Sequence, residues 1–182
     1  INHAQGLAVA VANADQYAIR NNTLTNNGES GLNLTNSKDV TVVENTISGN
    51  GTYAMGLYDI TRADVSSNTV SGHSTGISVG TSSDTTIKSN KVKGNGNSIS
   101  LSGLSSFKVQ NNTVGQSSGP ALTIYQSSGA QVTGNNIGVD TDGITPLPNS
   151  SIGVLMAGDL GGSVLGGLNA SDKNIITNNL HG

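Results

Sequence analysis

The chain has 182 residues, of which 10% are charged and 3% aromatic, and its formal net charge is −3. The eight Lys and Arg residues are spread along the sequence, which argues against nucleic acid or an anionic membrane surface as a partner. The absence of Cys excludes disulfides and thiolate metal sites, and the absence of a run of about 18 apolar residues argues against membrane insertion.

A repeated tripeptide, Asn followed by a polar and then an aliphatic residue, organises most of the sequence. Its asparagines are Asn22, Asn45, Asn68, Asn90, Asn112 and Asn135. They are separated by 23, 23, 22, 22 and 23 residues. A fixed period in this range predicts a solenoid in which every repeat forms one coil.

Each repeat contains three short segments in which apolar residues alternate with polar ones. One segment contains Val40 and Val42, and the segment before it contains Leu32 and Leu34. Asn, Gly and Ser residues separate the segments and are typical of turns. An apolar period of two favours strands over helices. The pattern predicts an all-β, three-sided parallel β-helix of roughly eight coils of 22–23 residues.

The repeated asparagine has a physical role in such a stack. At a turn, the amide of one coil can donate a hydrogen bond to the amide of the next coil and accept one from the coil before it. We therefore expect the six asparagines to stabilise the coils rather than to take part in catalysis.

The regular pattern extends over a single domain, residues 1–182, and loosens after Asn135. Residues 138–152 include Pro146 and Pro148 and predict a loop ejected from a turn. The chain begins without Met and stops within a repeat. We therefore expect it to be part of a longer solenoid whose open ends contact neighbouring coils or subunits.

The tripeptides and their spacing resemble the right-handed parallel β-helix repeat proteins. That group includes pectate lyases, alginate lyases, mannuronan C5-epimerases, phage tailspikes and bacterial surface proteins. The resemblance implies a right-handed coil and a secreted or cell-surface location. It also implies a polysaccharide or cell-surface glycan as the partner.

Lyases and epimerases of this fold neutralise a uronate carboxylate and move a proton, which requires Ca²⁺ or Arg together with an acid and a base. The segment that offers such groups supplies the candidate catalytic residues Tyr58, Asp59, Arg62 and Asp64. Strict alternation places Asp59 inside the coil, hydrogen-bonded, whereas a bulge would turn it outward to a site. A turn in which Asp59 pairs with Arg62 is the third alternative.

Other features argue against a complete catalytic site. The equivalent outward positions are uncharged: Ala8, Asn33, Ser78, Ser100 and Thr123. The histidines His3, His73 and His181 fall in different coils, so we expect them at the surface and assign no metal ligands. The segment from Asp140 to Gly143 favours an Asx turn over a calcium loop, because it lacks further acidic ligands. The sequence assigns no cofactor. Ca²⁺ is the one that the lyase alternative would use.

Two further surfaces carry possible functions. Lys88, Lys108 and Tyr125 are candidate substrate-binding residues, because their side chains could contact sugar hydroxyls or carboxylates. The pairs Thr23/Thr25 and Thr46/Ser48 begin a hydroxyl array similar to that of β-helical ice-binding proteins, which Lys91 and Lys93 interrupt.

The sequence thus predicts an extracellular β-helix module that acts as a rigid stalk, an adhesin or a glycan-contacting surface. The alternative is a polysaccharide lyase or C5-epimerase that acts on uronate polymers. Ice binding is a third hypothesis.

Overall fold

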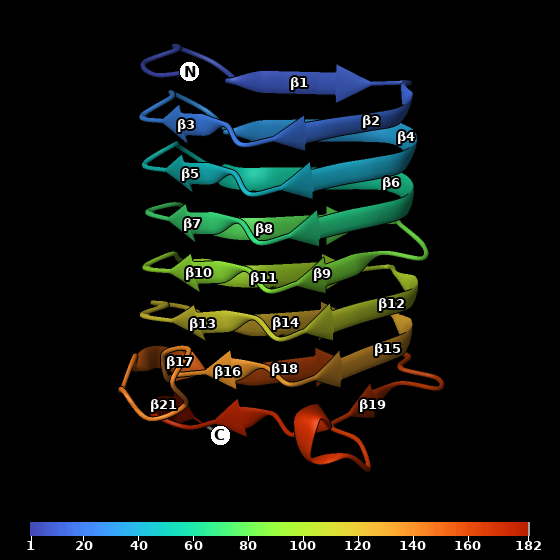
Figure 1. Cartoon of the computed structure of the whole chain (residues 1–182), viewed down its shortest axis with the longest axis vertical. Helices are drawn as coiled ribbons and strands as arrows, with labels where there is room; N and C mark the ends of the chain where they lie inside the picture. Colours follow the sequence, from blue (N-terminus) through green and yellow to red (C-terminus); the bar gives the residue numbers. More distant parts are fainter. Residues whose placement is uncertain (182) are drawn as a thin grey trace.

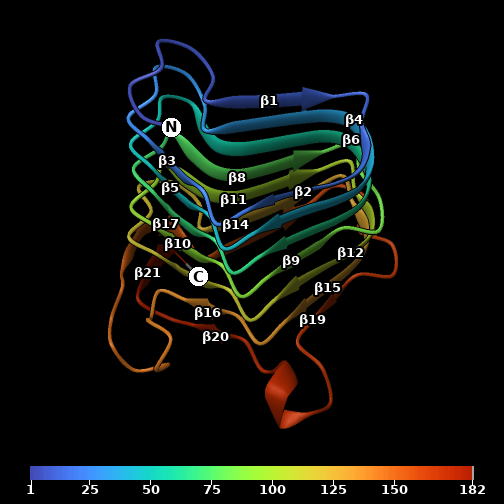
Figure 2. The ribbon, with the colours of Figure 1, turned by 45° about the horizontal axis from the view of Figure 1, so that its top comes forward.

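The computed structural model describes residues 1–181, and Gly182, the last residue of the predicted domain, lies outside this range. The chain winds into a stack of coils (Figure 1), and Figure 2 shows the strands of successive coils lying above one another. Within residues 1–181 the helical structure consists of one 3₁₀ turn, η1 (Ala170–Asp172). The predicted all-β parallel β-helix is confirmed.

Three faces surround the core. The first face contains β1 (Val9–Ala12), the first half of β4 (Leu32–Val43), the first half of β6 (Tyr53–Ser66), β8 (Thr75–Gly80), β11 (Asn97–Ser102), β14 (Leu122–Tyr125) and β18 (Val154–Ala157). The second face contains β2 (Asp15–Arg20), the second halves of β4 and β6, β9 (Thr86–Lys88), β12 (Ser105–Gln110), β15 (Ser128–Thr133) and β19 (Val164–Leu165). Because β4 and β6 continue through the corner between them, these two faces form one 12-stranded sheet.

The third face is a separate 7-stranded sheet. It contains β3 (Thr23–Thr25), β5 (Thr46–Ser48), β7 (Thr69–Ser71), β10 (Lys91–Lys93), β13 (Thr113–Gly115), β16 (Asn136–Ile137) and β20 (Ile175–Ile176). A small sheet of β17 (Asn149–Ile152) and β21 (Asn179–His181) lies near the C-terminal end.

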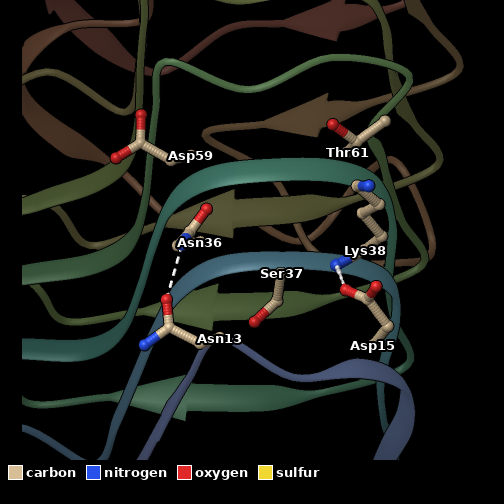
Figure 3. A pocket seen from close by; sticks show the side chains of 7 residues that line it. All are labelled: Asn13, Asp15, Asn36, Ser37, Lys38, Asp59 and Thr61. Atoms are coloured by element: carbon tan, nitrogen blue, oxygen red, sulfur yellow. Dashed lines mark hydrogen bonds between the residues drawn. The ribbon is translucent and has the colours of Figure 1, made fainter.

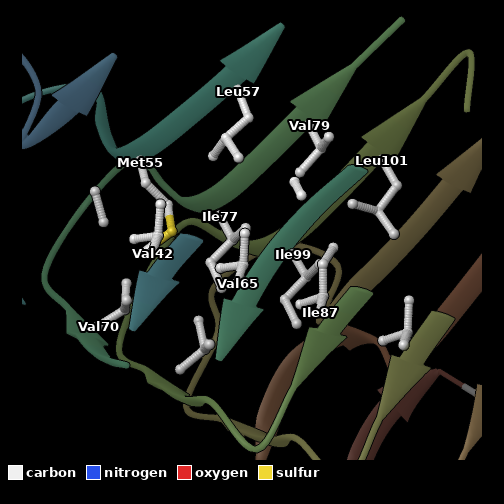
Figure 4. Packing of buried hydrophobic residues seen from close by; sticks show 14 of the residues in the cluster. Val42, Met55, Leu57, Val65, Val70, Ile77, Val79, Ile87, Ile99 and Leu101 are labelled. Atoms are coloured by element: carbon white, nitrogen blue, oxygen red, sulfur yellow. The ribbon is translucent and has the colours of Figure 1, made fainter. Parts of the chain in front are cut away.

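Parallel pairing in register stacks equivalent side chains into columns. Inside the first face, Leu57 pairs with Val79 and Val79 with Leu101, and Val65 pairs with Ile87 on the second face. These side chains are buried and pack between the faces (Figure 4). Strands separated by about 4.8 Å keep such a column in contact along its length, so one continuous apolar core holds the coils together.

The corner between the second and third faces is made by a left-handed residue followed by a tripeptide asparagine. The left-handed residues are Asn21, Glu44, Ser67, Ser89, Asn111 and Gly134, with φ between 52° and 67°. Gly134 adopts this conformation without strain, and Asn does so more readily than other non-glycine residues. The chain thereby turns sharply and directs the asparagine side chain inward.

The tripeptide asparagines form a column of hydrogen bonds that we call the asparagine ladder. Each Nδ2 donates to the Oδ1 of the next member at 3.0–3.1 Å, from Asn22 to Asn135. Asn174, which lies outside the tripeptide pattern, accepts the next such bond from Asn135 at 3.0 Å. From Asn45 onward, each Oδ1 also accepts the backbone N–H of the ladder member in the preceding coil, at 2.9 Å between Asn45 and Asn68. The ladder therefore satisfies backbone groups that strand pairing leaves free.

A second buried polar column runs through the corner between the third and first faces. It contains Asn27, Asn50, His73 and Asn95, all at most 5% exposed. The Nδ2 of Asn27 donates to Oδ1 of Asn50 at 2.7 Å, and Nδ2 of Asn50 lies 3.1 Å from Nε2 of His73. The expectation that His73 lies at the surface is therefore wrong, because position 73 occupies the corner that asparagine occupies in the neighbouring coils.

The number of coils is smaller than predicted. Within the described residues the third face has seven strands, one from each of seven coils, slightly fewer than the roughly eight coils predicted. The reason is that 39 residues separate Asn135 from Asn174 along the sequence, compared with 22 or 23 in earlier coils. This long coil includes residues 138–148, which connect β16 to β17, and the connections on either side of β19.

Residues 138–148 fold back onto the third face. The carboxylate of Asp140 lies 2.8 Å from Nζ of Lys93 and 3.5 Å from Nζ of Lys91. The hydrogen bond from Lys93 lowers the pKa of Asp140. Leu147 covers Gly115, where an added Cβ would lie 2.5 Å from the Cβ of Leu147. The two lysines that interrupt the hydroxyl array therefore help to hold this loop against the sheet.

Replacing an internal member of the ladder should destabilise the protein. In Asn68→Ala, the Oδ1 of Asn90 and the backbone N–H of Asn45 each lose a buried partner, which should cost about 1–3 kcal/mol. Denaturant unfolding measures this cost as a lower midpoint. Thr69→Ala, at an exposed neighbouring position, should change the free energy of unfolding by less than about 0.5 kcal/mol. Equal midpoints for Asn68→Ala and the unmodified protein would contradict a stabilising role for the ladder.

The environment of His73 should make stability depend on pH. The Oδ1 of Asn50 accepts a hydrogen bond from Asn27, so the Nδ2 donor of Asn50 is the atom that faces Nε2 of His73. On the other side of the ring, Nδ1 of His73 faces the acceptor Oδ1 of Asn95 at 3.3 Å. A proton on Nε2 would therefore place two donors, Nε2–H and the Nδ2 amide of Asn50, opposite each other. Burial also lowers the pKa of His73 from 6.5. Because the unfolded state then binds the proton first, the free energy of unfolding should fall as the pH drops below about 6.5, by up to about 1.4 kcal/mol per pH unit.

His73→Asn should remove the part of the pH dependence of stability that His73 causes, and it should fold because asparagine occupies the same position in neighbouring coils. His181→Asn, at an exposed position, is the matched control and should keep the pH dependence of the unmodified protein. Urea titrations between about pH 7 and pH 5 measure both profiles. Parallel profiles for His73→Asn and the unmodified protein would refute the role of His73.

Candidate functional site

The four candidate catalytic residues lie in three different places. Tyr58 points outward from the first face, Asp59 and Arg62 lie at the corner that β6 crosses, and Asp64 points outward from the second face. The structure therefore does not bring them together as one site.

Asp59 is exposed because the backbone reverses the alternation at this position. Its φ is 56°, a left-handed conformation, and the equivalent residues Asn13 and Asn36 have the same conformation. Figure 3 shows the three side chains following one another along the corner. Of the three alternatives for Asp59, the inward position is therefore wrong, since the alternation rule holds only for extended residues.

The nearby charged groups pair with residues of adjacent coils. Nε and Nη2 of Arg62 donate to the two carboxylate oxygens of Asp39 at 2.6 and 2.8 Å, so the partner of Arg62 is Asp39 rather than Asp59. These hydrogen bonds lower the pKa of Asp39. Nζ of Lys88 lies 3.1 Å from Oδ2 of Asp64. Two of the four catalytic candidates are thus engaged in ion pairs.

The candidate substrate-binding residues lie on two faces. Lys88 and Lys108 are outward residues of β9 and β12 on the second face, and Lys88 is paired with Asp64. Tyr125 belongs to β14 on the first face and its residue is 46% exposed. Lys108 and Tyr125 are therefore separated by a corner of the coil.

A shallow depression of about 310 Å³ lies at the corner between the first and second faces. Its lining includes Asp15, Lys38 and Asp59 together with Asn13 and Asn36 (Figure 3). Asp15 accepts a hydrogen bond from the backbone N–H of Lys38 at 3.0 Å, and Asn36 donates to Asn13. One cation among two carboxylates leaves this depression with a net negative charge.

A second depression, which we call the tyrosine depression, lies on the first face near the N-terminal end. Its volume is about 530 Å³. It is lined by Leu7, Glu29, Ser30, Asn33, Thr35, Thr52, Tyr53 and Tyr58. Aromatic and aliphatic surface with a few polar groups is typical of small-molecule sites.

Tyr58 leans across the sheet within this depression. A Cβ added at Gly56 or at Gly80 would lie 2.9 Å from a ring carbon of Tyr58, so both glycines leave room for the ring. The hydroxyl oxygen lies 2.9 Å from Oγ of Ser78 in the next coil. Tyr53 meets the ring edge-on, with 6.5 Å between centroids and an interplanar angle of 70°. Burial raises the pKa of Tyr58, so the phenol stays neutral.

The outward positions of the first face carry no charge in any of the seven paired coils. One column contains Ala10, Asn33, Gly56, Ser78, Ser100, Thr123 and Leu155. Its first member is Ala10 and not the predicted Ala8, because the first strand pairs two residues further along the chain. The adjacent column contains Ala12, Thr35, Tyr58, Gly80, Ser102, Tyr125 and Ala157. This lack of charge was expected from the sequence, whereas the contribution of Tyr53 and Glu29 to the depression was not. The available signal was the pair Gly56 and Gly80, which create space in otherwise polar columns.

Residues 1–181 contain no group of three or more His, Asp and Glu side chains that could hold a metal ion. The predicted Asx turn is present: Oδ1 of Asp142 accepts the N–H groups of Ile144 and Thr145 at 2.9 and 2.8 Å. Asp140 is bound by Lys93. Because ammonium and N–H donors already occupy these carboxylates, the segment does not fit Ca²⁺.

Comparison with solved structures supports the fold. The periplasmic alginate epimerase AlgG is 14% identical, with a TM-score of 0.69, and the match covers 86% of this chain and 43% of AlgG. A complex of XylC with xylose is 15% identical, with a TM-score of 0.59, over 78% of this chain and 22% of that one. The Dettilon tailspike protein is 14% identical, with a TM-score of 0.55, over 72% of this chain and 33% of the tailspike chain. This chain thus spans less than half the length of each.

A search of curated protein sequences gave no match. In the described part of the chain, no helix has the length and apolar character needed to span a bilayer. The family model for the right-handed beta helix region matches residues 1–137, which is about three quarters of the chain. With its three-faced parallel coil and this match, the chain belongs to the right-handed β-helix family.

Proposed function

We propose that the protein is a rigid extracellular β-helix module that contacts a glycan through the tyrosine depression. The observation that carries the proposal is the position of Tyr58, a large ring held over Gly56 and Gly80 by a hydrogen bond to Ser78. Sugar rings present C–H groups that pack against an aromatic ring and hydroxyls that need hydrogen-bonding partners. The depression offers both kinds of contact.

The surrounding fold supports this function. The continuous core and the asparagine ladder hold successive strands at a fixed spacing, so outward side chains of different coils keep their relative positions. The similar solved structures include an alginate epimerase and a phage tailspike, and one structure contains xylose. These relatives favour a carbohydrate partner and a location outside the cytoplasm. The stalk and adhesin roles are compatible with the same surface.

The lyase or C5-epimerase hypothesis is the alternative. It needs a positive group beside the uronate carboxylate and a nearby acid and base. Arg62 is bound to Asp39 at the corner, whereas Tyr58 lies on the first face. Their separation favours binding without catalysis. The ice-binding hypothesis is less favoured, since Lys91 and Lys93 bind the loop beside the short hydroxyl array.

Tyr58→Ala should weaken glycan binding by about tenfold, equivalent to about 1.4 kcal/mol. The measurement is binding to immobilised oligosaccharides of glucose, galactose, mannose and their uronic acids, followed by titration of the tightest binder. Ser102→Ala is the matched control, because Ser102 occupies the same outward column outside the depression. Circular dichroism verifies that both variants fold. Equal losses in the two variants, or no binding by the unmodified protein, would contradict the proposed function.

The protein should release no unsaturated product from pectate or alginate in the presence of Ca²⁺. The reason is that the candidate acid, base and cation do not converge within residues 1–181. Ultraviolet absorbance of the product is the measurement. NMR of the recovered polymer detects epimerisation in the same sample. Product that disappears in a folded Asp59→Asn variant would establish the enzymatic alternative.

A further inference from the structure

The charge of the tyrosine depression differs from what an acidic glycan requires. Among the described residues that line it, Glu29 is the single charged side chain. The other polar groups are the hydroxyls of Ser30, Thr35, Thr52 and the tyrosines and the amide of Asn33. These groups can donate to and accept from sugar hydroxyls, but none supplies a positive charge for a carboxylate.

The surroundings add no free cation to the first face. Its two outward columns contain no Lys or Arg over all seven paired coils. At the adjacent corner, Arg62 is bound by both oxygens of Asp39, and Lys38 lines a depression that also contains Asp15 and Asp59. A polymer that crosses the coils over Tyr58 therefore meets neutral or negative surface.

We propose that the tyrosine depression selects uncharged glycans and discriminates against uronates, with Tyr58 as the stacking platform and Glu29 as the group that repels a carboxylate. The inference rests on the proposed glycan-binding function and names the chemical class of its ligand. Specificity of this kind combines a favourable contact for one ligand with an unfavourable one for its competitor.

Two matched ligand pairs test the proposal. The first is an oligomannuronate and the neutral oligosaccharide obtained by reducing its carboxyl groups, and the second is an oligogalacturonate treated in the same way. Each pair keeps its linkages and differs only in charge. Calorimetric titration of the full chain should give at least about tenfold tighter binding of the neutral member in one or both pairs. Both members of a pair should lose affinity in Tyr58→Ala and keep it in Ser102→Ala, a change in the same outward column outside the depression.

The role of Glu29 is tested by Glu29→Gln. This change should tighten uronate binding by about threefold and leave neutral binding unchanged, because it removes repulsion without removing hydrogen-bonding capacity. Glu44→Gln is the matched control at an exposed corner away from the depression. Raising the salt concentration should likewise tighten uronate binding to the unmodified protein.

The outcomes separate the two proposals. Uronates that bind as tightly as their neutral partners, with both losing affinity in Tyr58→Ala, would overturn the preference for uncharged glycans while leaving glycan binding in place. An unchanged uronate affinity in Glu29→Gln would overturn the role of Glu29. Failure of all four oligosaccharides to bind would overturn both the preference and the proposed function.

Discussion

The coil-to-coil hydrogen bonds of the buried asparagines constrain the rest of the structure. A coil must turn three times within 22 or 23 residues, and a sharp turn interrupts the strand pairing that satisfies backbone groups. At the corner between the second and third faces, the side chain of Asn68 restores the missing partners: its Oδ1 accepts from Asn45, and its Nδ2 donates to Asn90 and to the carbonyl of Val42. An apolar residue there would leave these groups buried and unpaired.

This constraint explains where the chain can vary. The sequence separation of successive ladder members decreases from 23 to 22 at Asn90 and Asn112, and the column of hydrogen bonds continues through both. The 39-residue step to Asn174 keeps the same amide contact at 3.0 Å, because its extra residues leave the coil at the corners. One such excursion, residues 138–148, is held by Lys93 and Asp140 against the outer surface of the third face. Extra length is thus accommodated outside the core, where it does not disturb the stacked side chains.

The repeat was readable from the sequence because each column imposes the same requirement in every coil. The second polar column was not predicted, because its residue type changes from asparagine to histidine at position 73. The constant spacing was the available signal, since every member follows a ladder residue by five positions: Asn27, Asn50, His73 and Asn95. The orientation of Asp59 depends on a single left-handed residue, which alternation cannot anticipate; Asn13 and Asn36 at equivalent positions were the available signal. The contact between Lys93 and Asp140 joins residues 47 positions apart, so no local pattern encodes it.

The outward columns of the first face are under weaker constraints, and this makes their departures informative about function. Core positions must be apolar and corner positions must satisfy backbone groups, whereas an outward strand position tolerates most small polar residues. Tyr58 is a large residue in a column that otherwise has Thr35, Gly80 and Ser102 beside it, and the fold does not require its size. Its ring nevertheless has space cleared by two glycines and a fixed hydroxyl partner. This oriented aromatic surface next to an uncharged sheet favours the proposed glycan contact, since coil stability is already supplied by the ladder and the core.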